Sequence, residues 1–143
     1  MSFRNVEVLR SVHENWNRRN FDASTRDLAE NCSYADHARG ETMHGKRRFR
    51  EYLESWARAW SDGKITNARY MDVGDTVIAE FIGAGTNDGF LAGLPPTGRS
   101  VAFRFCEIWQ FDKNGYMTSG RCYYDLYSIL TQLGHLKPIA MAA

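Results

Sequence analysis

The segment from Arg99 to Phe111 constrains the fold most, because apolar and polar residues alternate along most of its length. Alternate residues of a β-strand point to the same face of its sheet. One face of this predicted strand therefore carries Phe103, Phe105, Glu107, Trp109 and Phe111. A long strand with a row of aromatic side chains on one face predicts a sheet that covers an apolar interior.

Further strands and turns are expected on both sides of this segment. Two shorter period-two segments precede it, a hairpin turn with the sequence DKNG follows it, and another strand comes after the turn. The glycine-rich stretch from Gly83 to Gly98 predicts a flap or long hairpin at a pocket mouth or dimer contact. The predicted strands are Ser33–Asp36, Ile65–Asp72, Thr76–Gly83 and Tyr116–Tyr124, and a loop is expected between Gly40 and Gly45.

Four helices are predicted from apolar residues that recur every three or four positions and from capping residues. In the second, Ser24 caps a short helix that runs through Leu28 and Ala29. In the last, Asp125 caps the helix and Gly134 ends it. The other helices are Phe3–Trp16 and Lys46–Trp60, and the last is Leu126–Leu133.

Helices followed by consecutive strands with tight turns predict an α+β domain. We expect a strongly bent, mainly antiparallel sheet, closed on one side by the N-terminal helices into a cone with an internal pocket. The 143 residues fit a single domain over residues 1–137, with residues 138–143 as a flexible tail.

Composition excludes several partners. A formal net charge of +1 argues against nucleic acid and anionic membranes, and no apolar run approaches the length of a membrane span. Three cysteines that form no CxxC pair, and no secretory signal, predict free thiols in the cytoplasm. The histidines lack metal-ligand spacing and the glycines match no phosphate loop, so we expect neither metal nor cofactor.

Glu107 is the principal candidate for chemistry, because it is the one carboxylate in the aromatic row. Glutamate is seldom buried without a partner or a task, so we expect either a general acid or base or a structural ion pair with Arg121 or Arg104. A turn centred on Lys113 and Asn114 sets Glu107 opposite Gly120 or Arg121. A slip of one residue exchanges the faces, so either Arg121 or Cys122 points inward.

The sequence allows two interpretations at each of three other places. Cys122 is a nucleophile only with a nearby base, and an inert buried thiol is the simpler interpretation. Asp125 either acts in the pocket or caps the last helix. Asp36 and His37 are neighbours on a strand, so only one of the two is expected to enter the pocket.

Several motifs together resemble the SnoaL-like polyketide cyclases of the NTF2-like superfamily. They are GLPPTG at residues 93–98, the aromatic strand Phe103–Phe111, Asp125 with Gln132-Leu133-Gly134, and HGKRRFREYLESWARAWSDGKI from His44 to Ile65. The resemblance implies a cone-shaped, often dimeric α+β barrel with a deep pocket and no cofactor. Members of this family close a polyketide ring by aldol condensation with an aspartate and a histidine, whose positions fall on Cys122 and Glu107 here.

These observations lead to one principal hypothesis. It is an enzyme, acting as a homodimer on a hydrophobic polyketide-like or aromatic molecule, that transfers protons in a cyclisation or isomerisation. The alternatives are a hydroxylase or hydroxylase partner, and a non-catalytic binding module. The catalytic candidates are Glu107, Asp125, Arg121 and Cys122, and the substrate-binding candidates are Trp16, Tyr34, Asp36, His37, Trp56, Phe103, Phe105, Trp109 and Tyr124.

Overall fold

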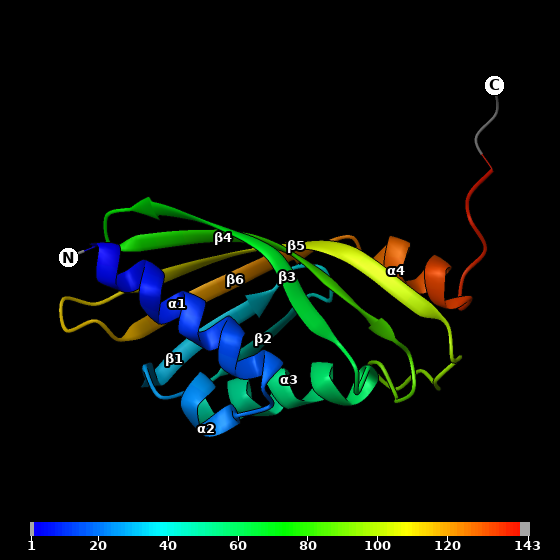
Figure 1. Ribbon diagram of the computed structural model, residues 1–143, viewed down its shortest axis with the longest axis horizontal. Coiled ribbons are helices and arrows are strands. Elements are labelled where there is room, and N and C mark those ends of the chain that lie inside the picture. The colour runs from blue at the N-terminus through cyan, green and yellow to red at the C-terminus, as the bar shows by residue number, and fades with distance from the viewer. Residues whose placement is uncertain (1, 141–143) are drawn as a thin grey trace.

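A curved six-stranded sheet arches over two long helices in the computed structural model of the protein (Figure 1). The structure describes residues 2–140, and their side chains from Arg4 onward, so the side chain of Phe3 and the end of the expected tail lie outside the described residues. The helices are α1 (Ser2–Asn17), α2 (Phe21–Ser24), α3 (Lys46–Ala59) and α4 (Leu126–Leu133). The strands are β1 (Leu28–Asp36), β2 (Glu41–His44), β3 (Lys64–Val73), β4 (Thr76–Thr86), β5 (Ser100–Phe111) and β6 (Met117–Tyr124).

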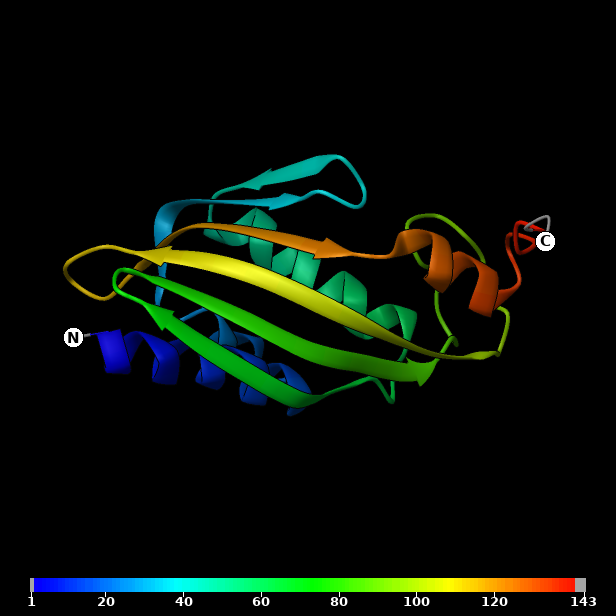
Figure 2. The ribbon, with the colours of Figure 1, turned by 90° about the horizontal axis from the view of Figure 1, so that it is seen from above.

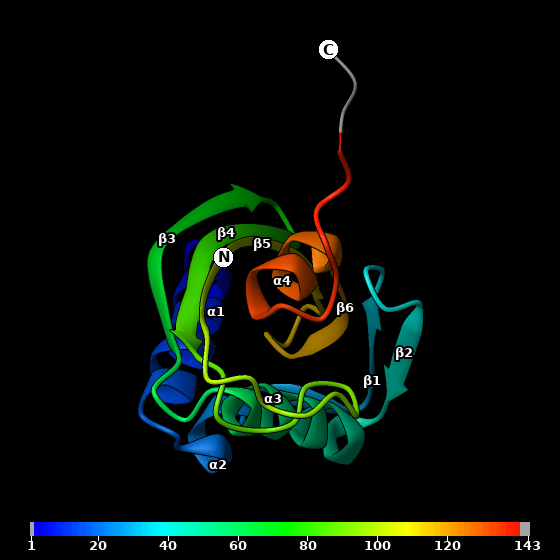
Figure 3. The ribbon, with the colours of Figure 1, turned by 90° about the vertical axis from the view of Figure 1, so that its right-hand side faces the viewer.

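The sheet is unclosed, with strand order β2-β1-β6-β5-β4-β3 (Figure 2). All neighbouring pairs are antiparallel except β1 and β6, which run parallel. Helix α1 packs against β3 and β4, and α3 packs against β1 and β2. Seen from one end, the sheet wraps over both helices (Figure 3). The expected bent α+β architecture is therefore present, and its core lies between the concave face of the sheet and α1 and α3.

The predicted faces of β5 are confirmed. Phe103, Phe105, Glu107, Trp109 and Phe111 are all buried, and the residues between them are exposed or half-buried. The predicted α4 is also confirmed: Asp125 accepts a hydrogen bond from the backbone N–H of Ser128, and Gly134 ends the helix in the left-handed conformation.

Two predictions for the first half of the chain are wrong. Ser24 does not begin a helix but ends α2, which Asn20 caps, and Leu28 and Ala29 begin β1. The expected loop between Gly40 and Gly45 contains β2, an edge strand antiparallel to β1. Only Met43 of β2 is fully buried, so the segment is too short and too polar for its alternation to be visible in the sequence.

The register of β5 and β6 also differs from the expectation. Glu107 lies opposite Cys122, because Gln110 pairs with Ser119 while Phe111 pairs with Met117. Thr118 is thus an extra residue on β6, a β-bulge that a turn-based alignment does not include. The bulge turns Cys122 inward, where it is fully buried, and leaves Arg121 on the convex face.

The glycine-rich stretch is partly strand and partly a pinned loop. Strand β4 continues to Thr86, and residues 87–99 then join β4 to β5 without a helix. The buried side chain of Asn87 holds this loop: its amide donates to Ala59 O at 3.0 Å, and its oxygen accepts from the Thr97 N–H at 2.9 Å. The loop is therefore tied to the end of α3.

We predict that Gly120→Ala destabilises the fold. A Cβ atom at Gly120 would lie 2.6 Å from Trp109 Cδ2 and 2.7 Å from Tyr34 Cδ1, both in fully buried rings. Such overpacking costs about 1–3 kcal/mol. Urea unfolding should show this loss, whereas Ser119→Ala, one position along β6, should unfold almost as the wild type does. Equal stability of both variants would contradict this account of the β5–β6 packing.

Candidate active site

An interior cavity lies between the concave face of the sheet and helices α1 and α3. The space open to the centre of a water molecule is about 60 Å³, which is room for about four to six waters. Since each water takes up about 30 Å³ in the liquid, these waters together have the volume of a molecule of roughly two fused rings. The walls are mainly aromatic and include Trp16, Tyr34, Tyr52, Trp56, Phe103 and Phe105.

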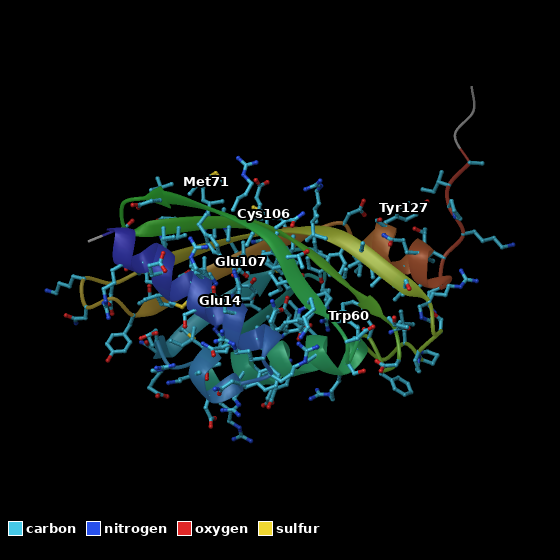
Figure 4. The ribbon with its side chains drawn as sticks, in the orientation of Figure 1. Glu14, Trp60, Met71, Cys106, Glu107 and Tyr127 are labelled. Carbon is cyan, nitrogen blue, oxygen red and sulfur yellow. The ribbon has the colours of Figure 1, made fainter. Side chains whose placement is uncertain are left out.

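Glu107 projects from β5 into this cavity, between the sheet and α1 (Figure 4). The residue is 6% exposed, and both carboxylate oxygens have partners. His13 Nε2 lies 2.8 Å from Oε1, and the Tyr34 hydroxyl donates to Oε2 at 2.8 Å. The expected ion pair with Arg121 or Arg104 is therefore wrong, since both arginines lie on the opposite face of the sheet.

His13 links Glu107 to the side of the domain where α1 meets β3. Its second ring nitrogen, Nδ1, lies 2.7 Å from the Tyr70 hydroxyl, and its ring meets Phe81 edge-on. Because an ionised carboxylate can only accept, the arrangement assigns the Nε2 hydrogen to the bond with Glu107. In neutral His13 the Nδ1 atom then accepts from Tyr70. A continuous chain of hydrogen bonds thus runs from half-buried Tyr70 through His13 and Glu107 to Tyr34.

A second buried carboxylate, Asp36, lies at the end of β1 and is 1% exposed. The hydroxyl groups of Tyr52 and Tyr124 both donate to Oδ2 at 2.8 Å. The Arg39 backbone N–H donates to Oδ1 at 3.0 Å. Asp36 does not line the cavity itself but fixes the Tyr52 side chain, which does.

Cys122 separates the two carboxylates. The pairing of β5 with β6, and of β6 with β1, places Glu107, Cys122 and Asp36 side by side across the sheet. The thiol lies 3.5 Å from the Tyr52 hydroxyl. Burial, and then the charge of Asp36, raises the pKa of Cys122 to about 12. The sulfur is therefore a protonated thiol at neutral pH, which does not favour a nucleophilic role.

The structure brings together many of the residues selected from the sequence. Trp16, Tyr34, Trp56, Phe103 and Phe105 line the cavity with Glu107. Two more lie behind this wall: Trp109 packs against Tyr34, and Tyr124 stacks on Phe105. Neither is among the cavity-lining residues.

Three selected residues lie elsewhere. Exposed His37 stacks on the Tyr123 ring at 4.9 Å, so of the Asp36–His37 pair only Asp36 points inward. Arg121 is on the convex face, and Asp125 is exposed and caps α4. The geometry thus removes Arg121 and Asp125 from the surroundings of Glu107.

Sequence reasoning missed His13, Tyr52 and Tyr70. His13 follows Leu9 by four residues and precedes Trp16 by three, so it lies on the apolar stripe of α1. That spacing was the available signal for a buried histidine. Tyr52 belongs to the buried face of α3, but its partner Asp36 is on a distant segment.

Comparison with known proteins agrees with this architecture. The model of the SnoaL-like polyketide cyclases matches residues 6–133. The chain belongs to the SnoaL-like polyketide cyclase family. No curated protein sequence matches this SnoaL-like chain.

Solved structures show the same fold. AclR from Streptomyces galilaeus, a candidate hydroxylase, superposes with a TM-score of 0.83 at 16% identity, covering 98% of this chain and 87% of its own. A candidate SnoaL-like polyketide cyclase from Jannaschia sp. CCS1 has a TM-score of 0.85 at 16% identity and covers 94% of each chain. A protein of ketosteroid isomerase-like fold from Catenulispora acidiphila, solved with trimethylamine, has a TM-score of 0.76 at 23% identity, with 92% and 98% covered.

Within residues 2–140, no three or more His, Cys, Asp or Glu side chains are arranged to hold a metal ion. In the same part of this SnoaL-like chain, no helix combines the length and the apolar character needed to cross a membrane.

We predict that the protein loses stability at alkaline pH. Burial raises the pKa of Tyr34 and Tyr52 well above the usual tyrosine value, with further contributions from the neighbouring Glu107 and Cys122 respectively. Above about pH 9 the unfolded chain therefore releases protons that the folded chain retains, so the free energy of unfolding falls as pH rises. Each such group contributes at most about 1.4 kcal/mol per pH unit.

Urea unfolding between pH 8 and 10.5 measures this slope. Tyr52→Phe, which removes one buried phenol, should make the slope shallower, and Tyr116→Phe, at an exposed position, should leave it unchanged. A free energy of unfolding that stays constant over this range would show that the buried phenols ionise freely.

Proposed function

We propose that this SnoaL-like protein is an enzyme that transfers a proton on a flat, hydrophobic, oxygenated molecule of polyketide or aromatic type. The reaction class is cyclisation or isomerisation, and Glu107 is the acid and base. One observation carries the proposal: among the described residues that line the cavity, Glu107 is the sole carboxylate, and it faces aromatic walls.

The reaction neither consumes nor releases protons overall, because the proton that Glu107 removes is returned to the product. The Glu107 carboxylate takes a proton from a carbon beside a carbonyl, and an enolate forms. In an isomerisation the carboxyl group returns the proton to another carbon. In a cyclisation the enolate carbon bonds to a second carbonyl carbon, and the proton goes to the oxygen that becomes a hydroxyl. The same group thus serves first as base and then as acid.

His13 and Tyr34 act on Glu107 as positioning residues. Their hydrogen bonds, both 2.8 Å long, fix the carboxylate on the two sides that do not face a substrate. They satisfy both oxygens of a carboxylate that is buried among aromatic side chains.

Position 122 supports proton transfer at Glu107 in place of the pair implied by the family resemblance. The position that matches the family's aspartate carries the protonated Cys122 thiol, whose pKa is raised to about 12 by burial. The nearest carboxylate to replace it is Asp36, but that group already accepts three hydrogen bonds. Glu107 is left as the group with access to the substrate.

Homodimerisation and a cytoplasmic location belong to the same proposal. Sedimentation velocity tests the first: a single species of twice the chain mass is the expected result. Fractionation of cells that make the protein tests the second.

We predict that Glu107→Gln abolishes most of the proton transfer. A suitable assay is deuterium uptake at the acetyl methyl group of 2-acetylnaphthalene in D₂O, followed by mass spectrometry. The amide keeps the shape of the side chain but cannot accept and return a proton, so the exchange rate should fall by about 10²- to 10⁴-fold. Glu80→Gln, on the exposed face of β4, is the matched control and should exchange as the wild type does.

Three outcomes decide between the hypotheses. Loss of exchange in Asp125→Asn, with full activity in Glu107→Gln, would make Asp125 the acid. Saturable binding without exchange would indicate a binding module. Turnover that requires oxygen and a reductant would indicate a hydroxylase.

A further inference from the structure

The indole N–H of Trp56 is an unused hydrogen-bond donor in the wall of the cavity. Trp56 is 7% exposed, its Nε1 atom is buried, and that atom has no partner among the described residues. Phe103, Phe105 and Trp60 surround the ring and supply no accepting oxygen. The rings of Tyr52 and Tyr124 also pack against Trp56, but their hydroxyls donate to Asp36 and neither oxygen accepts from the indole N–H.

A comparison with the other tryptophans shows how the unpaired N–H of Trp56 differs from theirs. Trp16 also lines the cavity, but its N–H donates to the Leu53 carbonyl at 3.0 Å. Trp109 has an unpartnered N–H as well, but it is fully buried behind Tyr34 and is not part of the cavity wall. Trp60 lines the cavity too, but its Nε1 is not a buried atom without a partner. Of the four tryptophans, Trp56 is therefore the one whose ring lines the cavity and whose buried N–H is unpaired. A buried donor without a partner is costly, and a ligand acceptor would remove that cost.

Trp56 lies along the cavity from Glu107. Its ring stacks on Phe103 at 5.8 Å and meets Phe105 edge-on at 6.2 Å. Phe105 and Phe103 precede Glu107 by two and four residues on β5, so they lie about 7 and 13 Å from it along the strand. The part of β5 that Trp56 contacts therefore lies roughly 7 to 13 Å from Glu107, about the length of a two-ring molecule with an oxygen function at each end.

We propose that the Trp56 N–H recognises an oxygen acceptor of the substrate, a ring carbonyl above all, at the end remote from the carbon that Glu107 deprotonates. The substrate class is thus a flat aromatic molecule with at least two oxygen functions, one beside the reacting carbon and one across the ring system. The position of the reacting carbon rests on the proposed function, whereas the acceptor site at Trp56 is independent of it.

A pair of ligands isolates this hydrogen bond. 2,6-Diacetylnaphthalene and 2-acetyl-6-isopropenylnaphthalene have nearly the same planar shape, but the second replaces one C=O by C=CH₂. The dissociation constants of both ligands are measured with the wild type and with Trp56→Phe. For each protein the constant of the isopropenyl ligand is divided by that of the diketone, and the quotient for the wild type is divided by the quotient for the variant. The statistical factor from the two equivalent ends of the diketone cancels in this ratio of ratios. We expect the wild type to favour the diketone about three- to tenfold more than Trp56→Phe does, as for a neutral hydrogen bond.

Trp16→Phe is the matched control, because it removes a cavity indole whose N–H is already bonded. This variant should keep the wild-type preference. A ratio of ratios near one, or an equal loss of preference in Trp16→Phe, would overturn the proposal.

A second measurement needs no variant that must fold. In the wild type labelled with ¹⁵N-tryptophan, one indole N–H resonance should move downfield with the diketone and not with the isopropenyl ligand, whereas identical spectra would overturn the proposal. Both tests read binding alone. If the protein catalyses deuterium exchange but Trp56→Phe keeps the preference for the diketone, this inference is refuted and the proposed function stands. If Trp56→Phe loses that preference but the wild type catalyses no exchange, the acceptor site stands and the proposed function is refuted.

Discussion

A carboxylate inside an aromatic cavity is tolerated only where hydrogen-bond donors reach its oxygens, and this requirement organises the domain. The donors to Glu107 come from elements far apart in sequence: His13 from α1, and Tyr34 from β1. The N-terminal helix is thereby joined to the middle of the sheet by a polar contact as well as by apolar packing. Glu107 thus connects three elements of the fold, and the same contacts leave one side of the carboxylate open to the cavity.

The polar interior divides into two parts with different tasks. Around Glu107 the hydrogen bonds form an open chain that borders the cavity. Around Asp36 three donors form a closed cluster behind the wall. Tyr52 belongs to both, because it lines the cavity and is bonded to Asp36. Under the proposed function, Glu107 is the carboxylate that transfers the proton, and Asp36 fixes the shape of the pocket through Tyr52.

Local pattern was sufficient for much of the fold and for one side of the site. The alternation in β5 places Glu107 among aromatic side chains, and the caps of α4 identify Asp125 as structural once the helix is seen. The failures are non-local. The bulge at Thr118 depends on how β6 pairs with its neighbouring strands. Strand β2 is stabilised by its pairing with β1. His13 contacts Glu107 only after α1 has packed against the sheet. Contacts between distant segments leave no periodic trace in the sequence.

The bulge at Thr118 has a consequence for how such a pocket can diversify. Every residue of β6 beyond it points to the face that the extra residue dictates, because side chains alternate with a period of two. A hairpin of the same length that paired without the bulge would continue the register of Phe111 and Met117, so Arg121 would lie opposite Glu107 on the concave face and Cys122 would lie on the convex face. The presence or absence of one bulge can thus exchange a neutral neighbour of Glu107 for a cation, so a change of strand register can alter the surroundings of this carboxylate as point substitution does.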